Sequence, residues 1–510
     1  MLAKILSGTT IGLDGMLIEV EVDVASRGFP TFNLVGLPNK AVEEAKDRVR
    51  TSIINTSFEM PDSRITVNLA PADIPKTGSS FDLPIAIGIL AASGMLKKEE
   101  LEHSLFVGEL SLEGKVRSVP GIISISLMAR EKNIKTLFVP RENAKEAAMV
   151  EDLCIIPINT LADLILHING QQIIPFFPPV DLETIQNDIK PWEFDFSEIK
   201  GQNQAKRAME IAAAGFHNLH LKGVPGAGKT MLSKAFPSIL PPMDKMEILE
   251  VSKIYSVNGL INHHGFITKR PFRCPHHTTS RIGLIGGGTN PAPGEISLAH
   301  RGVLFLDEFP EFPRSVLEAL RQPLEDGIVS ISRAAGSVTF PCRFLLLAAS
   351  NPCQCGYLGH PQKKCQCMPG SVLKYRKKLS GPLLDRIDLH IDVPPVSHEK
   401  LTSLAAEESS IKICSRILAA RKKQQIRFLK TNIKMNGEMT PKDIKKLCIL
   451  EDDASQLLKQ AITRLSLSAR SYFKIIKVAR TIADLEQVEK ISSPHIAEAL
   501  QYRAKEDMQL

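Results

Sequence analysis

The residues Gly223, Val224, Pro225, Gly226, Ala227, Gly228, Lys229 and Thr230 fit the phosphate-binding pattern G-x-x-x-x-G-K-[ST] at every constrained position. Glycines let the backbone curl so that successive N–H groups point at phosphate oxygens, and a helix that begins near Lys229 adds its positive dipole end. We expect Lys229 to reach the β- and γ-phosphates of ATP and Thr230 to hold Mg²⁺. A strand predicted over 218–222 and a helix over 231–235 supply the structural context of this motif.

Two further strands are predicted to end in polar residues. The apolar run from Val303 to Leu306 is followed by Asp307 and Glu308, as in a buried parallel strand that delivers acids to the edge of a sheet. Asp307 would hold Mg²⁺, and Glu308 would orient or deprotonate the attacking water. The run 344–350 ends at Asn351, which could help to place that water. A core strand ending at a polar turn, and a turn asparagine before a proline, are the alternatives.

Length and composition indicate a large protein without a membrane segment. At 510 residues the chain should form two to four domains. Its longest apolar stretch, 83–96, is shorter than the roughly 20 residues that a bilayer requires. The N-terminus lacks the apolar core and cleavage site of a signal peptide, so we expect a cytoplasmic location.

The positive charge is concentrated in two stretches. Lys and Arg number 63 and Asp and Glu 56, which leaves 63 − 56 = +7 and permits a polyanionic partner without requiring one. Residues 359–381 contain six basic residues and no acid, and residues 409–437 contain eight and no acid. If the second stretch is helical, six of its basic residues form a stripe, which is either a solvated face or a track for phosphates.

Four of the nine cysteines form two C-x-C pairs, namely Cys353, Cys355, Cys365 and Cys367. In a cytosolic chain such residues are free thiols or metal ligands rather than disulfides. Four thiolates could close a tetrahedral Zn²⁺ shell and stiffen a loop that is too polar to build its own core. Reduced cysteines without a metal are the alternative.

Patterning divides the chain into successive parts. Residues 1–170 begin with a strand in which Ile18, Val20, Val22 and Val24 alternate with acids, followed by a helix over 39–54. The proline-rich stretch 171–192 is predicted to be a linker. A nucleotide domain is expected over 193–396 and a helical domain over 397–510.

These motifs, with the run 271–280 and the run 381–388, resemble the magnesium-chelatase-like AAA+ ATPases of the ComM (YifB) type. The resemblance covers essentially the whole chain. It implies an α/β fold, namely an AAA+ P-loop core with a helical lid, a helix-2 insert at roughly 245–295 and hexamer assembly. It also implies an ATP-driven DNA helicase that migrates branches, independently of sequence, during natural transformation.

The same resemblance assigns three arginines. Arg386 lies at the position of the arginine finger, which enters the neighbouring subunit's site. Arg470 matches the sensor arginine of the lid, which contacts the nucleotide of its own subunit. The segment 328–339 is predicted to be a hairpin that projects into a central pore, where Arg333 would grip a DNA phosphate. Surface or ion-pairing arginines and a plain surface hairpin are the alternatives.

Residues 1–170 resemble the proteolytic (S5-like, α+β) domain of Lon. Ser80 stands where the protease has its catalytic serine, but Ile123 occupies the position of the lysine that activates it. Isoleucine accepts no proton, so we predict a domain without proteolytic activity.

The sequence is therefore compatible with three classes of function. The first is a DNA-translocating ATPase, which we favour. The second is a protein-remodelling ATPase, either a chaperone or a chelatase motor subunit. The third is an ATP-dependent peptidase, against which Ile123 argues.

Overall fold

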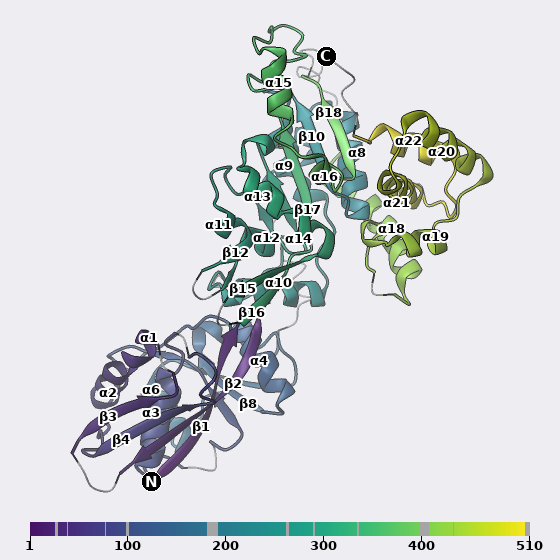
Figure 1. The fold of residues 1–510 in the computed structure, drawn as a ribbon. Coiled ribbons are helices and arrows are strands. Elements are labelled where there is room, and N and C mark those ends of the chain that lie inside the picture. Colours follow the sequence, from purple (N-terminus) through teal and green to yellow (C-terminus); the bar gives the residue numbers. More distant parts are fainter. Residues whose placement is uncertain are drawn as a thin grey trace. The chain divides into compact units, whose positions relative to one another are not determined.

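The computed structural model describes residues 1–25, 29–37, 39–76, 78–97, 101–180, 192–261, 265–288, 291–333, 336–396, 407–431 and 433–504. The chain forms two compact units (Figure 1). The first comprises Met1–Asp188, Asp244–Thr268 and Ala334–Val338, and the second comprises Ile189–Met243, Lys269–Arg333 and Thr339–Leu510. Within the described ranges, no helix is long and apolar enough to cross a bilayer. Half of the predicted linker, residues 181–191, lies outside them.

The first unit is built on a mixed seven-stranded sheet with the order β3-β4-β2-β1-β5-β8-β9. β2 pairs antiparallel with β1 and β4, and the other neighbours in the sheet pair in parallel. The strands are β1 (Leu2–Ile11), β2 (Asp14–Val24), β3 (Thr31–Val35), β4 (Arg64–Ala70), β5 (Ser104–Phe106), β8 (Thr136–Pro140) and β9 (Cys154–Ile158). A separate hairpin joins β6 (Glu109–Leu110) and β7 (Val116–Arg117).

Both faces of this sheet are covered. Successive residues of one strand enter different hydrophobic clusters, as Leu105 and Phe106 do, because side chains alternate between the faces of a sheet. The cluster that holds Phe106 includes the fully buried α3 (Asp82–Ala92), and the other includes α4 (Ile122–Glu131). The predicted alternation of β2 is confirmed at Ile18, Val20 and Val22, which are buried, whereas Val24 at the end of the strand is only partly buried.

The helix predicted over 39–54 is confirmed with one interruption. It forms α1 (Lys40–Glu43), which Asn39 caps, and α2 (Ala45–Asn55). Two further helices of this unit are α5 (Ala144–Ala147) and α6 (Leu161–Ile168).

One helix of the first unit comes from far along the chain. α10 (Lys245–Val257), which begins the expected helix-2 insert, packs against α4. The amide of Gly121 donates to the carbonyl of Ser256 at 3.0 Å, and the Ser256 hydroxyl donates to the buried carboxylate of Glu146. Burial raises the pKa of Glu146. The start of the insert is thus anchored by polar contacts inside the N-terminal unit.

The second unit contains a parallel five-stranded sheet with the order β11-β14-β17-β10-β18. Its strands are β11 (Phe272–Arg273), β14 (Val303–Leu306), β17 (Leu345–Ser350), β10 (Leu219–Gly223) and β18 (Leu389–Val393). The predicted strands before Lys229, Asp307 and Asn351 are therefore neighbours, with β17 between the other two. All three end at the same edge, where their polar residues can meet.

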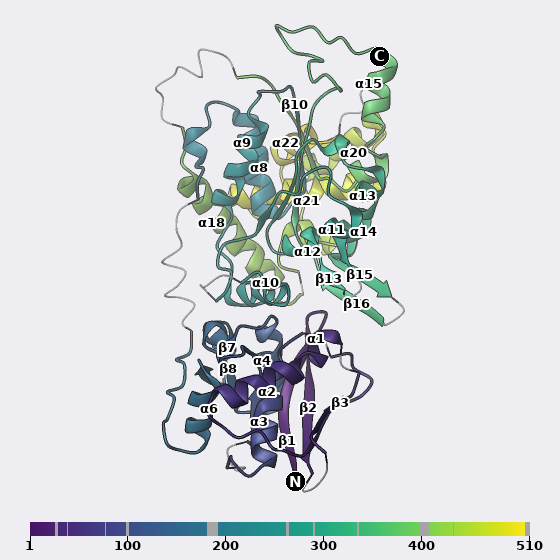
Figure 2. The ribbon, with the colours of Figure 1, turned by 90° about the vertical axis from the view of Figure 1, so that its left-hand side faces the viewer.

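Helices cover this sheet and continue into a C-terminal helical group (Figures 1 and 2). A single hydrophobic cluster joins the sheet to this group, in which α18 and α21 pack on α8. The longer helices are α8 (Asn203–Gly215), α9 (Lys229–Ala235), α13 (Arg314–Ala319), α14 (Arg321–Asp326), α15 (Pro369–Arg376), α18 (Ser410–Phe428), α19 (Pro441–Leu447), α20 (Asp452–Leu465), α21 (Ala469–Leu485) and α22 (Ser493–Gln501).

The basic stripe predicted over 409–437 begins on α18, but its arginines are engaged within the protein. Arg416 binds the carboxylates of Glu210 and Glu408, and Arg427 binds the fully buried carboxylate of Asp484. These arginines pack α18 against its neighbours, which argues against a continuous track for phosphates.

Candidate nucleotide site

The phosphate-binding loop connects β10 to α9, as the sequence predicts. Gly226 and Gly228 have φ values of +79° and +88°, in the left-handed region that glycine adopts without strain. A side-chain carbon at either position would meet no atom within 4 Å, so the glycines are required for backbone conformation and not for close packing. The N-terminus of α9, which is the positive end of its helix dipole, lies directly after this loop.

Lys229 lies at the first position of α9 and is buried. Its Nζ donates to the carbonyl oxygens of Gly223, at 2.6 Å, and Val224, at 3.0 Å, and to Oδ1 of Asn351, at 3.1 Å. Burial lowers the pKa of this ammonium group. The structure therefore brings together the predicted lysine and the predicted asparagine, which come from neighbouring strands.

The predicted magnesium ligands also meet. The Thr230 hydroxyl donates to Oδ2 of Asp307 at 3.0 Å, which joins the phosphate loop to the end of β14. Hydroxyl and carboxylate oxygens are ligands that suit Mg²⁺, so this pair fits the ion that accompanies a nucleotide. Glu308 follows with a φ of +49° and donates its amide to Oδ1 of Asp307 at 2.9 Å. This left-handed conformation of a non-glycine residue marks a locally strained position beside the site.

His277 also lies beside Glu308, although no motif in the sequence pointed to it. Its Nδ1 lies 3.4 Å from Oε2 of Glu308, the predicted water-activating acid. The sequence contains two adjacent histidines, His276 and His277, and no spacing rule connects them with an acid 31 residues later. Only the pairing of β11 with β14 brings this loop beside Glu308.

Arg386 and Arg470 converge on one carboxylate. Nη2 of Arg386 lies 2.8 Å from Oε2 of Glu325, and Arg470 binds Oε1 of the same residue. These two positive charges lower the pKa of Glu325 against the opposing effect of burial. The three residues line a cavity of about 720 Å³. Both predicted arginines are thus held together on Glu325, a residue that the sequence did not single out.

The predicted hairpin forms from β15 (Ile328–Arg333) and β16 (Gly336–Pro341). Arg333 is the last residue of β15. Its side chain lies outside the described part of the structure, as do residues 334 and 335, so its contact with DNA stays a prediction.

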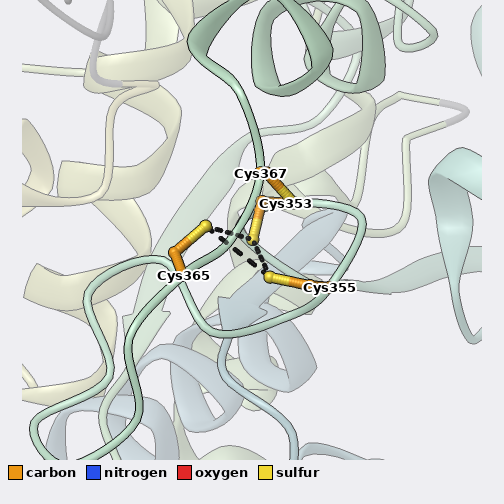
Figure 3. A group of neighbouring side chains, drawn as sticks. All are labelled: Cys353, Cys355, Cys365 and Cys367. Carbon is orange, nitrogen blue, oxygen red and sulfur yellow. Dashed lines mark hydrogen bonds between the residues drawn. The ribbon is translucent and has the colours of Figure 1, made fainter.

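The four predicted cysteines gather in the loop between β17 and α15 (Figure 3). Their sulfur atoms all lie within 4.8 Å of one another. The sulfur of Cys353 is 3.4 Å from that of Cys355 and 3.7 Å from that of Cys365, and Cys355 and Cys365 are 3.6 Å apart. Backbone amides of Tyr357 and Gln366 hydrogen-bond to the Cys355 sulfur and lower its pKa to about 6.

In the N-terminal unit, the polar side chains of the loop before Ser80 hydrogen-bond to groups other than Ser80. Ser79 donates to the carboxylate of Glu109, and the buried Lys76 donates to the carbonyl of Pro71. Ile123 is fully buried in α4. Among the described residues, no base is hydrogen-bonded to the Ser80 hydroxyl.

Three family models match the chain and together cover most of it. They are described as magnesium chelatase subunit ChlI, over residues 195–401, subunit ChlI of Mg-chelatase, over residues 20–143, and the C-terminal part of subunit ChlI, over residues 407–503.

Relatives extend the similarity to the full length. The chain is 45% identical to competence protein ComM of Haemophilus influenzae, over 99% of this chain and 97% of that protein. It is 41% identical to the protein YifB of Salmonella typhimurium, over 99% and 97% respectively. Lon protease of Rhizobium meliloti is 29% identical over 32% of this chain and 21% of its own length. With its phosphate loop, its parallel sheet and its Lon-like N-terminal region, the chain belongs to the ComM/YifB-type, magnesium-chelatase-like family of AAA+ proteins.

Proposed function

We propose that this protein is a hexameric motor that hydrolyses ATP to move along DNA, and that it migrates branches while incoming single strands are integrated during natural transformation. The observation that carries the ATPase part is the meeting of Lys229, Thr230, Asp307 and Asn351 at one sheet edge. The DNA part rests on the relative named as a competence protein, with which this chain shares 45% identity over nearly its whole length.

Each residue of the site has a defined task in this proposal. The ammonium group of Lys229 exchanges its backbone carbonyl partners for the β- and γ-phosphate oxygens of ATP. Thr230 and Asp307 hold Mg²⁺, which neutralises charge on the phosphates. Glu308 orients the attacking water, and Asn351 fixes both the lysine and that water. His277 restrains Glu308 until substrate arrives.

Assembly of the ring supplies the remaining positive charge at the γ-phosphate. Arg386 acts in trans as the arginine finger at the neighbouring subunit's γ-phosphate, and Arg470 acts as the lid's sensor arginine. Both must exchange the carboxylate of Glu325 for a phosphate. Hydrolysis therefore depends on ring formation, and Glu325 keeps the two arginines paired in the isolated chain.

DNA contact is assigned to the hairpin of β15 and β16, with Arg333 binding a phosphate. Such a contact is independent of sequence and weakens with salt, because bound cations are released from the DNA. Aromatic residues are scarce, at 5% of the chain, so the proposal involves tracking along the backbone rather than stacking on bases.

The proposal is tested with the purified full chain on a three-stranded branch-migration substrate and on a labelled fork. We expect strand displacement that requires ATP and is absent from Lys229→Ala. Arg333→Ala should weaken binding to single strands and lower the slope of log K against log salt by about one unit. Rings that hydrolyse ATP at a rate unaffected by DNA, and that bind no oligonucleotide, would refute the DNA motor and favour a protein-remodelling ATPase.

A further inference from the structure

The loop that follows Asn351 has no hydrophobic core of its own. Between the end of β17 and the start of α15, this loop contains no helix or strand. None of the residues 361–370 is buried, all of which the structure describes. Cys353 is fully buried, whereas the other three cysteines of the cluster are partly buried. Apolar packing therefore does not explain why this loop folds back on itself.

The sulfur geometry fits a single tetrahedral ion. A Zn–S bond of about 2.3 Å places the corners of a regular tetrahedron about 3.8 Å apart. The three measured sulfur–sulfur distances of 3.4, 3.7 and 3.6 Å lie close to this value. They are far longer than the roughly 2.05 Å of a disulfide bond. Four soft thiolates favour Zn²⁺ over Mg²⁺ or Ca²⁺.

The charges around the cluster suit such a centre. Four thiolates and one Zn²⁺ carry a net charge of 4 × (−1) + 2 = −2. The surrounding stretch 359–381 contains six basic residues and no acid. The net charge of this stretch therefore has the sign that favours a negatively charged centre.

The cysteine loop also contacts the phosphate-binding loop. Gly356 lies between two of the cysteines in sequence, with a φ of +83°. A side-chain carbon at this position would lie 2.5 Å from Cγ of Pro225 and 3.9 Å from Cγ of Asn351. The amide of Gly356 donates to the carbonyl of Cys353 at 3.0 Å, which fixes the turn. A metal bound by the flanking cysteines would hold this turn against the phosphate loop.

We propose that Cys353, Cys355, Cys365 and Cys367 bind one Zn²⁺ ion, and that this ion holds Gly356 against Pro225 and so fixes the phosphate loop and Asn351 for nucleotide binding. The zinc site itself is independent of the proposed function, whereas its effect on nucleotide binding rests on the nucleotide site described above. Zinc loading thereby becomes a condition for tight binding of nucleotide, although the ion takes no part in hydrolysis.

The first experiment measures metal content of the full chain purified without chelators. We expect about one zinc per chain, with negligible iron, and thiolate charge-transfer absorption after exchange with Cd²⁺. Cys365→Ser combined with Cys367→Ser should lose the zinc and this absorption. Cys154→Ser, an exposed cysteine outside the cluster, is the matched control and should keep both. A wild-type chain that contains no zinc and gives no Cd²⁺ absorption overturns the site, and stoichiometric iron overturns its identity.

The second experiment separates the metal from its coupling to nucleotide. Gly356→Ala leaves every cysteine in place, so it should retain zinc but weaken binding of fluorescent MgADP about tenfold or more. Removing zinc from the wild type should weaken binding to a similar degree, and adding zinc back should restore it. Unchanged MgADP affinity in both cases overturns the coupling. If even the zinc-loaded wild type binds no MgADP, the nucleotide site fails instead, while the zinc measurement still stands.

Discussion

Two loops of this chain carry a buried lysine and, nearby in the sequence, a hydroxyl residue, but the surroundings of the two lysines differ. Lys229 in the phosphate loop and Lys76 in the loop before Ser80 are both buried, and burial lowers the pKa of both. Lys229 reaches Asn351 at the end of a neighbouring strand. Lys76 donates to the carbonyl of Pro71, five residues away.

The difference between the two loops lies in what surrounds the lysine. Around Lys229, three parallel strands deliver a threonine, two acids and an asparagine to one sheet edge. Around Ser80, the position expected to hold a catalytic base is a buried isoleucine. A lysine of lowered pKa thus indicates burial, and only convergent partners indicate chemistry.

The largest effect is expected from Lys229→Ala. Loss of the ammonium group removes its phosphate contacts, so nucleotide affinity should fall at least about a hundredfold, or about 2.8 kcal/mol, in a titration with fluorescent MgADP. Lys234→Ala, an exposed lysine of the same helix, should bind normally. Equal affinities for the two variants would remove the functional contrast between Lys229 and Lys76.

Arg386→Ala should lower ATP turnover by a factor of about 10³ to 10⁵ in assembled rings, because an arginine finger stabilises the charge of the transition state. Nucleotide binding by the variant should be unchanged. Mixing Arg386→Ala subunits with Lys229→Ala subunits should restore part of the turnover, since each interface regains one complete set of residues. Rings shown to be mixed that recover nothing would contradict action in trans.

Glu308→Gln should retain ATP binding and lower turnover about 10² to 10⁴ fold, the usual contribution of a general base. Single-turnover measurements would show ATP trapped on the protein. Glu311→Gln, an acid of the next turn that pairs with Lys378, should hydrolyse ATP at the wild-type rate. Normal turnover by Glu308→Gln would mean that another group activates the water.

Glu325→Gln tests the carboxylate shared by Arg386 and Arg470. The Glu325 side chain is about 40% exposed, so solvent screens its ion pairs with the two arginines. Because both arginines must leave Glu325 to reach a phosphate, ATP turnover should rise, but only about two- to fivefold. MgADP affinity should stay the same, because Glu325 does not contact the phosphate loop in the described structure. Glu113→Gln, an exposed acid of the N-terminal unit, is the control.

The sequence predicted those parts of the site that follow from local pattern. The phosphate loop, the strand before Asp307, the strand before Asn351 and the hairpin at 328–339 all form, because each depends on residues adjacent in the chain. Pairings across the chain could not be predicted. His277 beside Glu308 and Glu325 beside two arginines require the order of strands and helices. Packing of α10 within the N-terminal unit likewise follows from tertiary contacts that no spacing rule encodes.

The smallest effect is expected from Ser80→Ala. If the Ser80 loop is structural, ATP turnover, strand displacement and stability should match those of the wild type, and neither protein should cleave casein. The hydroxyl has no hydrogen-bonded base among the described residues, and a serine without a base stays protonated near neutral pH. Cleavage of casein by the wild type that Ser80→Ala abolishes would show that a base reaches Ser80 after all. Lys76, four residues upstream and with a lowered pKa, would then be the first candidate for that base. Both loops would be reactive, and they would differ only in how their partner residues are brought together.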